Sequence, residues 1–317
     1  MADRYSEDEL IARLFAPLAG PGALGLSDDA AIVPPGAGDL VITADMLVAG
    51  VHFFPDDPPA RIAQKALRTN LSDLAGKAAA PVGFLLSIAL PPDWTNDWLT
   101  GFASGLGADV RAYHAPLLGG DTSATSGPLT IAITALGRAA RRVPRRNGAR
   151  AGEGVFVSGT IGDAALGLAL RRAPERFPGL SRAHCDFLLD RYLLPRPRLD
   201  LIDLLGDCAT ASMDISDGLV GDLAKMCRVS GMSAIIDATR APLSEAARAA
   251  LSLDPACLGD ILTGGDDYEA LFTARPDFRP PPGIVRIGEI VARAEPPEIR
   301  GADGKPLSFA RPAFRHF

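Results

Sequence analysis

Segments with strand-like and helix-like patterns alternate along the chain, and this alternation restricts the possible folds more than any other feature. Short apolar runs at residues 40–43, 83–90 and 129–136 have the length of buried strands. Between the first two, Pro58-Pro59 precedes a long segment whose apolar residues recur at helical spacing. Chains in which strands alternate with helices usually belong to the α/β class. We therefore predict a mixed fold, α/β or α+β.

The length and one basic stretch predict two domains. The chain has 317 residues, and a domain usually takes about 150. The most basic stretch, residues 138–150, contains Pro144 and Gly148 and has little apolar content. Such a composition is typical of a connection between domains. We predict a first domain at residues 1–140 and a second at residues 148–317.

The charge balance and the cysteines exclude several classes of protein. Lys and Arg number 32 against 38 Asp and Glu, a formal net charge of −6, so we expect neither nucleic acid nor an anionic membrane as a partner. The longest apolar run, residues 82–90, is far shorter than the ~20 residues that cross a bilayer. Residues 1–9 are too acidic for a signal peptide. Because the four cysteines form no C-x-x-C pair, we predict a cytoplasmic protein without a zinc ribbon or redox dithiol.

Aspartates at strand ends, in glycine-rich turns and near helix starts are the candidates for chemistry. They lie next to apolar segments rather than in charged runs: Asp28, Asp29, Asp45, Asp73, Asp121, Asp214, Asp217, Asp266 and Asp267. Carboxylates without accompanying His or Cys suit Mg²⁺, which usually bridges one or two of them to substrate phosphates. Any single aspartate could instead cap a helix or form a turn. Together they favour a site for Mg²⁺ and phosphate, although spacing alone does not bring them to one place.

Three glycine patterns could bring main chain close to a phosphate. Residues 119–121 and 264–266 both read Gly-Gly-Asp, and Gly159 and Gly162 flank a predicted strand-to-helix turn. Taken singly, each is interpreted as a tight turn. The chain has no G-x-x-x-x-G-K-[ST], which excludes a P-loop kinase, and no G-x-G-x-x-G that supports a dinucleotide site. It also lacks the H-R-D and D-F-G motifs of protein kinases.

Six segments in order carry a resemblance to a known family. They are residues 28–31 (DDAA), 43–53 (TADMLVAGVHF), 70–74 (NLSDL), 119–122 (GGDT), 214–219 (DISDGL) and 264–269 (GGDDYE). Together they resemble the thiamine-monophosphate kinases, of the aminoimidazole-ribonucleotide-synthetase-like superfamily, and the resemblance extends from about Ser6 to Phe317. It implies the two-domain fold of that superfamily. The first domain would bind metal and ATP and form a homodimer through its sheet, and the second would complete the active site.

The resemblance also implies an activity. It is the direct in-line transfer of a phosphoryl group from ATP to thiamine monophosphate, with several Mg²⁺ ions. The implied Mg²⁺ ligands are Asp29, Thr43, Ala44, Asp45, Asp73, Asp121, Asp214 and Asp217. The implied ATP contacts are Gly120, Asp121, Arg146 and Ser216, and the implied substrate contacts are His52, Asp266 and Phe314. The residues expected to act in catalysis are Asp45, Asp73, Asp121, Arg146 and Asp214.

Several positions depart from the family pattern. Ser27 replaces Gly, Ala44 replaces Thr, Lys77 replaces an apolar residue, Asp266 replaces Glu, and Phe314 replaces Tyr or Trp. Ala44 can still offer its carbonyl to a metal, whereas the last two changes concern substrate affinity. Lys77 is spaced to share one polar helix face with Asn70 and Asp73.

Two other functions remain open. One is a different ATP-dependent synthetase of the superfamily, such as aminoimidazole ribonucleotide synthetase or selenophosphate synthetase. No cysteine precedes Cys185, so this chain has no cysteine near its N-terminus that could act as a nucleophile. This weighs against selenophosphate synthetase. The other is a non-catalytic nucleotide-binding partner, which the intact Asp45, Asp73, Asp121 and Asp214 disfavour.

Overall fold

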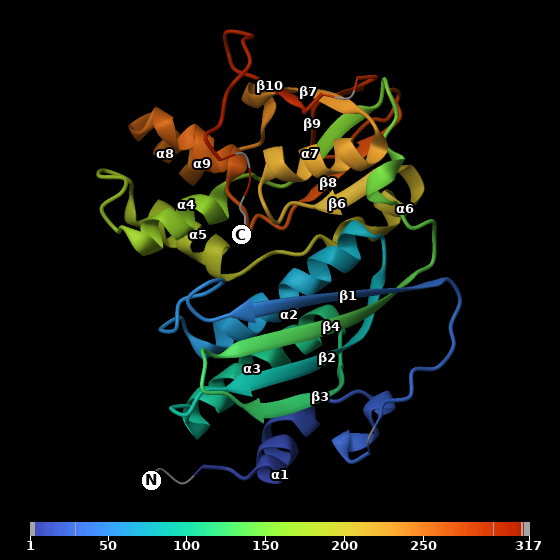
Figure 1. The fold of residues 1–317 in the computed structure, drawn as a ribbon, viewed down its shortest axis with the longest axis vertical. Helices are drawn as coiled ribbons and strands as arrows, with labels where there is room; N and C mark the ends of the chain where they lie inside the picture. The colour runs from blue at the N-terminus through green and yellow to red at the C-terminus, as the bar shows by residue number, and fades with distance from the viewer. Residues whose placement is uncertain (1–3, 29, 294, 312, 314–317) are drawn as a thin grey trace. The chain divides into compact units, whose positions relative to one another are not determined.

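The computed structural model consists of two compact units (Figure 1). The first contains residues 1–74 and 79–140, and the second contains residues 75–78 and 141–317. The short segment 75–78 therefore groups with the second unit, which the sequence did not indicate. Both units combine a sheet with helices, so the predicted mixed class is confirmed. The residues that the structure describes are 4–28, 30–293, 295–311 and 313.

The first unit contains a mixed sheet with the strand order β1 (Asp39–Val48), β4 (Thr130–Ala139), β2 (Ala80–Leu90) and β3 (Leu117–Ala124). The pairs β1–β4 and β4–β2 are antiparallel, whereas β2–β3 is parallel. One face of the sheet is covered by α2 (Pro59–Gly76) and α3 (Asn96–Tyr113), which lie behind the strands in Figure 1.

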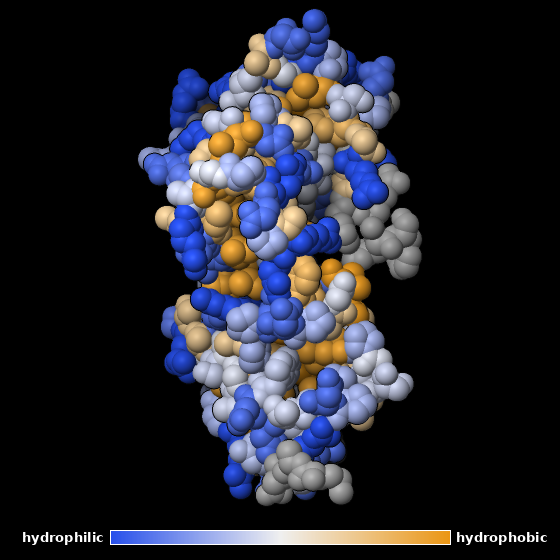
Figure 2. Space-filling view, turned by 90° about the vertical axis from the view of Figure 1, so that its left-hand side faces the viewer, coloured by the Kyte–Doolittle hydropathy of each residue, from blue (hydrophilic) through white to orange (hydrophobic). Residues whose placement is uncertain are grey.

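Buried and half-buried residues alternate along the strands, and this alternation identifies the buried face of the sheet. On β4, Ile131 and Ile133 are 0% and 1% exposed, whereas Thr130, Ala132 and Thr134, which alternate with them, are half-buried. A period of two puts one set of side chains against the helices and the other set on the opposite face. On β1 that opposite face carries Leu40, Ile42 and Met46, which are 46%, 60% and 58% exposed. Figure 2 shows a different side of the molecule, on which hydrophobic residues also reach the surface among hydrophilic ones.

The N-terminal segment begins with a capping box formed by Ser6 and Glu9. The Glu9 N–H donates to the Ser6 hydroxyl, and the Ser6 N–H donates to the Glu9 carboxylate. Helical turns follow as α1 (Glu7–Leu10), a π-turn η1 (Ile11–Phe15), and the 3₁₀ turns η2 (Ala16–Leu18) and η3 (Pro21–Leu26).

The second unit contains a sheet with the order β10 (Glu298–Arg300), β7 (Ser233–Asp237), β9 (Ile284–Val291), β5 (Gly154–Ser158), β8 (Ala270–Ala274) and β6 (Ala211–Asp214). Only the pair β10–β7 is parallel among the described pairs. Val155 and Val157 enter one apolar cluster, and Phe156 enters another with Leu205. Because β5 is buried on both faces, residues 154–158 carry little polar character.

The helices of the second unit supply these clusters. The first cluster takes apolar residues from α4, α5, α7, α8 and α9, and the second from α6. Their bounds are α4 (Asp163–Arg172), α5 (Arg182–Leu193), α6 (Ile202–Cys208), α7 (Leu219–Ser230), α8 (Glu245–Leu253) and α9 (Leu258–Thr263). The short turns are η4 (Arg146–Gly148), η5 (Leu199–Leu201), η6 (Ala238–Arg240) and η7 (Pro255–Cys257). None of the helices that the structure describes is long and apolar enough to cross a membrane.

Two local predictions were wrong. Residues 119–121 form no tight turn but lie within β3, where they pair with β2. The glycines there allow two strands to approach closely, which a local sequence pattern cannot distinguish from a turn. Lys77 does not share a helix face with Asp73, because α2 ends at Gly76 and the chain turns at Lys77 and Ala78.

Candidate active site

β1 and α2 bring three predicted site residues together in the first unit. The Thr43 hydroxyl donates a hydrogen bond to the Asp73 carboxylate. The Asp45 N–H donates to the side-chain oxygen of Asn70 at 3.2 Å. Thr43 and Asp45 are two residues apart on a strand, so both face α2. Asn70 and Asp73 are three residues apart on α2, so both face β1.

The Asp45 carboxylate lies where a negative charge is unfavourable. Burial is the largest influence on the pKa of Asp45, and together with the negative charge of Asp73 it raises that pKa to about 6. A hydrogen bond with Thr69 lowers the pKa by a smaller amount. A desolvated carboxylate beside a like charge favours either a proton or a bound cation. The oxygens of Asp45, Asp73 and Thr43 are the hard donors that Mg²⁺ prefers. This donor set therefore fits magnesium.

His52 lies half-buried in the turn after β1. Its Nδ1 accepts a hydrogen bond from the Val48 N–H at 2.9 Å. A ring nitrogen that accepts from an amide carries no proton, so the proton of the neutral imidazole is on Nε2. His52 can therefore donate through Nε2. Ala44, in contrast, is exposed on the sheet face opposite to Thr43 and Asp45.

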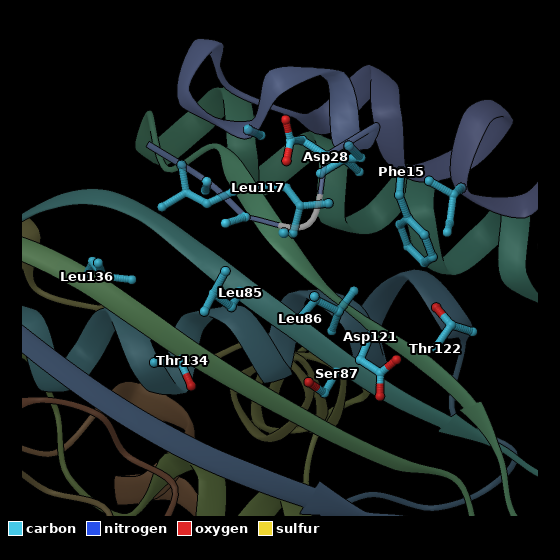
Figure 3. A pocket seen from close by; sticks show the side chains of 18 of the residues that line it. Phe15, Asp28, Leu85, Leu86, Ser87, Leu117, Asp121, Thr122, Thr134 and Leu136 are labelled. Carbon is cyan, nitrogen blue, oxygen red and sulfur yellow. The ribbon is translucent and has the colours of Figure 1, made fainter. Parts of the chain in front are cut away.

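A pocket of about 750 Å³ lies in the first unit, between the N-terminal segment and the strands β2 and β3 (Figure 3). Gly120, Asp121 and Asp28 line it. Asp121 pairs in register with Ser87, and the two side chains are neighbours in Figure 3. Ser87 is exposed between two buried residues of β2, so it and Asp121 lie on the face away from α2.

The predicted metal ligands of the first unit are thus divided between two faces of one sheet. Asp45 and Asp73 are on the helix-covered face, and Asp121 is on the other. Among the described residues, no group of three or more His, Cys, Asp and Glu side chains could hold a metal ion. Two further predicted site residues, Asp29 and Phe314, lie outside the described residues.

Gly120 allows β3 to run close to β2. A Cβ atom at this position would lie 1.8 Å from the main-chain oxygen of Leu86. Gly120→Ala is therefore expected to lower the free energy of unfolding by at least about 2 kcal/mol in urea denaturation. At Gly119 an added Cβ would meet only a side-chain carbon of Leu85, at 3.4 Å, so Gly119→Ala is the matched control. Equal stability of the two variants would contradict the close approach.

In the second unit, two predicted site segments lie against each other. The Asp266 N–H donates to the Ser216 carbonyl at 2.9 Å, and the Tyr268 N–H donates to the Ile215 carbonyl at 2.8 Å. A Cβ atom at Gly265 would lie 2.1 Å from the Ser216 oxygen, so this contact requires glycine. The fold therefore brings the predicted ATP residue Ser216 beside the predicted substrate residue Asp266.

Two residues that the sequence analysis missed fix the turn after Asp214, which is itself 5% exposed at the end of β6. The buried Asp222 accepts hydrogen bonds from the N–H groups of Ser216 and Asp217, both at 2.9 Å. Burial raises the pKa of Asp222, and this effect exceeds that of Lys225, whose hydrogen bond and positive charge lower the pKa. Lys225 pairs with Asp222 at 2.8 Å and also with Asp217. Asp222 could have been found, because carboxylates in the first turn of a helix often bind main-chain N–H groups.

A buried ionic network adjoins Asp266, and of its members the sequence analysis had named only Asp267. Arg191, 2% exposed, donates to the Glu269 carboxylate at 3.2 Å. Asp267 is fully buried, and both its oxygens accept the Gly162 N–H at 2.9 Å. Burial raises the pKa of Asp267 well above its ordinary value. Charged residues within apolar segments, such as Arg191 in residues 187–194, were the available signal.

The sequence analysis also named two cationic residues, Arg146 and Lys77, and their surroundings differ from each other. Arg146 is exposed in η4, and its carbonyl accepts the Ser230 hydroxyl at 3.1 Å. Lys77 donates to the main-chain oxygens of Ser212 and, at 3.4 Å, of Pro144. Lys77 therefore binds main chain in the second unit.

Comparison with known proteins identifies related enzymes. The chain matches the family models for the N-terminal domain of AIR synthase related proteins at residues 27–139 and for the C-terminal domain at residues 150–276. A thiamine-monophosphate kinase from Caulobacter vibrioides is 42% identical over 86% of this chain and 78% of that protein.

Solved structures agree in fold along nearly the whole chain. The thiamine-monophosphate kinase of Stenotrophomonas maltophilia is 36% identical, with a TM-score of 0.78 over 89% of this chain and 91% of that one. AaThiL, solved in complex with AMPPCP and TMP, is 29% identical, with a TM-score of 0.80 over 98% of this chain and 94% of that one. The chain therefore belongs to the thiamine-monophosphate kinases of the AIR synthase related family.

Proposed function

We propose that this protein transfers the γ-phosphoryl group of ATP to thiamine monophosphate, forming thiamine diphosphate. The Caulobacter vibrioides relative is named as such a kinase, and AaThiL was solved with TMP and with AMPPCP, an ATP analogue. The observation in this chain that carries the proposal is the crowded pair Asp45 and Asp73 beside Thr43. An enzyme that joins two polyanions needs cations, and this donor set favours one.

Magnesium is the cation that the donor chemistry supports. When bound, Mg²⁺ neutralises and orients the oxygens of the reacting phosphates. Asp217 is paired with Lys225, so a metal there has to share that carboxylate with the ammonium group or displace it. The ligands that we propose are Asp29, Thr43, Ala44 through its carbonyl, Asp45, Asp73, Asp121, Asp214 and Asp217.

For ATP we propose contacts with Gly120, Asp121, Arg146 and Ser216. Gly120 and Asp121 line a pocket of about 750 Å³. Gly120 has no side chain to keep a ligand away from the main chain. The exposed Arg146 guanidinium can bind two phosphate oxygens at once.

For thiamine monophosphate we propose contacts with His52, Asp266 and Phe314. The Nε2–H of His52 can donate to a phosphate oxygen, since its Nδ1 is occupied by the Val48 N–H. The Asp266 carboxylate is opposite in charge to the thiazolium ring of the substrate. The ring of Phe314 can stack on a heterocycle.

Transfer is proposed to be direct, without a phosphorylated protein. The acceptor is an ionised phosphate oxygen, so no base has to remove a proton, and positioning with electrostatic stabilisation supplies the rate. Enzyme incubated with γ-labelled ATP and no acceptor is expected to stay unlabelled after quenching. Stoichiometric protein label that passes into product when thiamine monophosphate is added would contradict direct transfer.

A second copy of the chain is the partner proposed for the uncovered sheet face. Ile42 and Met46 on β1 are more than half exposed and lie on one face. Leu85 of β2 shares this face, since it and Ala44 both pair with Thr134. Contiguous apolar surface of this kind usually marks an interface, and a two-fold homodimer is the commonest assembly. The cytoplasmic location stays a prediction from the sequence.

An assay of ADP formation tests the function against its alternatives. With ATP and Mg²⁺, ADP is expected to form only when thiamine monophosphate is present. ADP formation that ignores thiamine monophosphate but responds to another acceptor would favour a different synthetase of the family. ATP binding without any turnover would favour a non-catalytic nucleotide-binding protein.

A further inference from the structure

The backbone beside the proposed substrate aspartate is strained. Asp266 has a φ of 67° and Tyr268 a φ of 52°, in the left-handed region that residues other than glycine rarely adopt. The nearby Gly264 is extended instead, with a φ of −77°. Strain of this kind persists only where the surroundings enforce it, and it is concentrated at functional sites.

The residue between the two strained positions anchors them. Asp267 is fully buried and accepts the Gly162 N–H with both carboxylate oxygens, at 2.9 Å. Arg191 donates to the Asp267 carbonyl at 3.4 Å. On either side, the main-chain bonds to Ile215 and Ser216 hold the strained residues themselves. The segment thus has little freedom to relax into ordinary backbone.

The result is a contact between two side chains of this segment. The Tyr268 hydroxyl donates to Oδ1 of Asp266 at 3.2 Å. Tyr268 is 9% exposed, whereas Asp266 is partly exposed, so the phenol reaches the carboxylate from the protein interior. A donor fixed by packing restricts the rotation of the carboxylate that it binds.

We propose that Tyr268 is a positioning residue, which holds the Asp266 carboxylate in the orientation that receives the positively charged end of thiamine monophosphate. The inference rests on the proposed function and adds to it the residue that orients the substrate contact. The left-handed backbone at both positions is what allows a residue two places along the chain to reach back to that carboxylate.

Tyr268→Phe tests the proposal because it removes only the hydroxyl. The dissociation constant of thiamine monophosphate, measured by titration calorimetry without ATP, is expected to rise about fivefold. The dissociation constant of AMPPCP, kcat and Tm are expected to stay unchanged. Tyr113→Phe is the matched control, since that ring packs against the Arg68 guanidinium on α2 and α3. Equal weakening of both ligands, or a lower Tm, would overturn a positioning role.

A double-mutant cycle tests whether Tyr268 acts through Asp266. Asp266→Gly removes the carboxylate and adopts the left-handed backbone without strain, so Tm is expected to rise while thiamine monophosphate binds at least about tenfold more weakly. Adding Tyr268→Phe to this variant is expected to cause no further loss, and an additive loss would overturn the proposal. If the unsubstituted protein binds no thiamine monophosphate, the proposed function fails. Normal binding with an unaffected Tyr268→Phe variant would reject the positioning role alone.

Discussion

Asp45→Asn is expected to lower kcat/KM for ADP formation at least about 100-fold while making the protein more stable. The amide keeps the size of the side chain but loses the charge that would bind a cation. Asp45 and Asp73 are crowded enough to raise the pKa of Asp45 to about 6, so a cation between them relieves repulsion as well as binding phosphate. The rate is measured at saturating Mg²⁺.

The stability gain has a defined pH dependence. The pKa of Asp45 in the folded chain, about 6, lies above its ordinary value of 3.8, so protonated Asp45 stabilises the fold at low pH. That stabilisation is lost as pH rises through about 6, where the buried carboxylate ionises. Asp45→Asn is therefore expected to raise the free energy of unfolding by about 1–3 kcal/mol near neutral pH and by nothing below about pH 4. Urea denaturation across this pH range measures it.

A matched variant separates this effect from a general loss of charge. Asp39 begins the same strand and is exposed, so Asp39→Asn is expected to change neither rate nor stability. Mg²⁺ is expected to raise the Tm of the unsubstituted protein and of Asp39→Asn but not of Asp45→Asn. Full activity of Asp45→Asn, or an equal Mg²⁺ response of all three, would reject the proposed metal ligand.

Ile42→Lys is expected to convert a homodimer into a monomer. Ile42 is 60% exposed on the apolar face of β1, and a dimer through this face would have to bury an unpaired ammonium group. The dissociation constant of the dimer is expected to rise at least about 100-fold, or ~2.7 kcal/mol. Sedimentation at micromolar concentration measures the change from about twice 33.1 kDa to 33.1 kDa.

The control for this variant is an apolar residue on another surface. Val229 on α7 is 48% exposed in the second unit, so Val229→Lys is expected to leave the dimer intact. A single 33.1 kDa species for the unsubstituted protein would reject the dimer altogether. An unchanged dimer in Ile42→Lys would place the interface elsewhere.

Much of the fold follows from local patterns. The segment after Pro58-Pro59 forms α2 as predicted, and its apolar residues Ile62, Leu67 and Leu71 are buried. The apolar run at residues 129–136 was predicted as a strand and overlaps β4.

The local pattern failed at residues 119–121, although the strand-to-helix turn predicted at Gly159 and Gly162 is present between β5 and α4. Gly120 allows β3 to lie close to β2. A tight turn could have the same Gly-Gly-Asp sequence, so the local pattern does not distinguish the two.

The candidate site was only partly predictable. The sequence identified Asp45, Asp73 and Asp121 as candidates, because carboxylates beside apolar segments are unusual. It could not foresee that Asp45 faces α2, on which Asp73 lies, while Asp121 lines the pocket on the other face of the sheet. In a strand, a shift of one residue exchanges the two faces, so the register in which β1, β4, β2 and β3 pair decides this point.

The sequence by itself determined the class of fold and the chemical character of the site, because both depend on residue types and on periods of a few residues. Only the tertiary structure decided which side chains meet, since contacts such as Thr43 with Asp73 join segments 30 residues apart. It also decided that Asp222 and Asp267 are buried anchors rather than exposed ligands. A carboxylate has the same formula in either role, and its solvent exposure and hydrogen-bond donors exist only after the chain has packed.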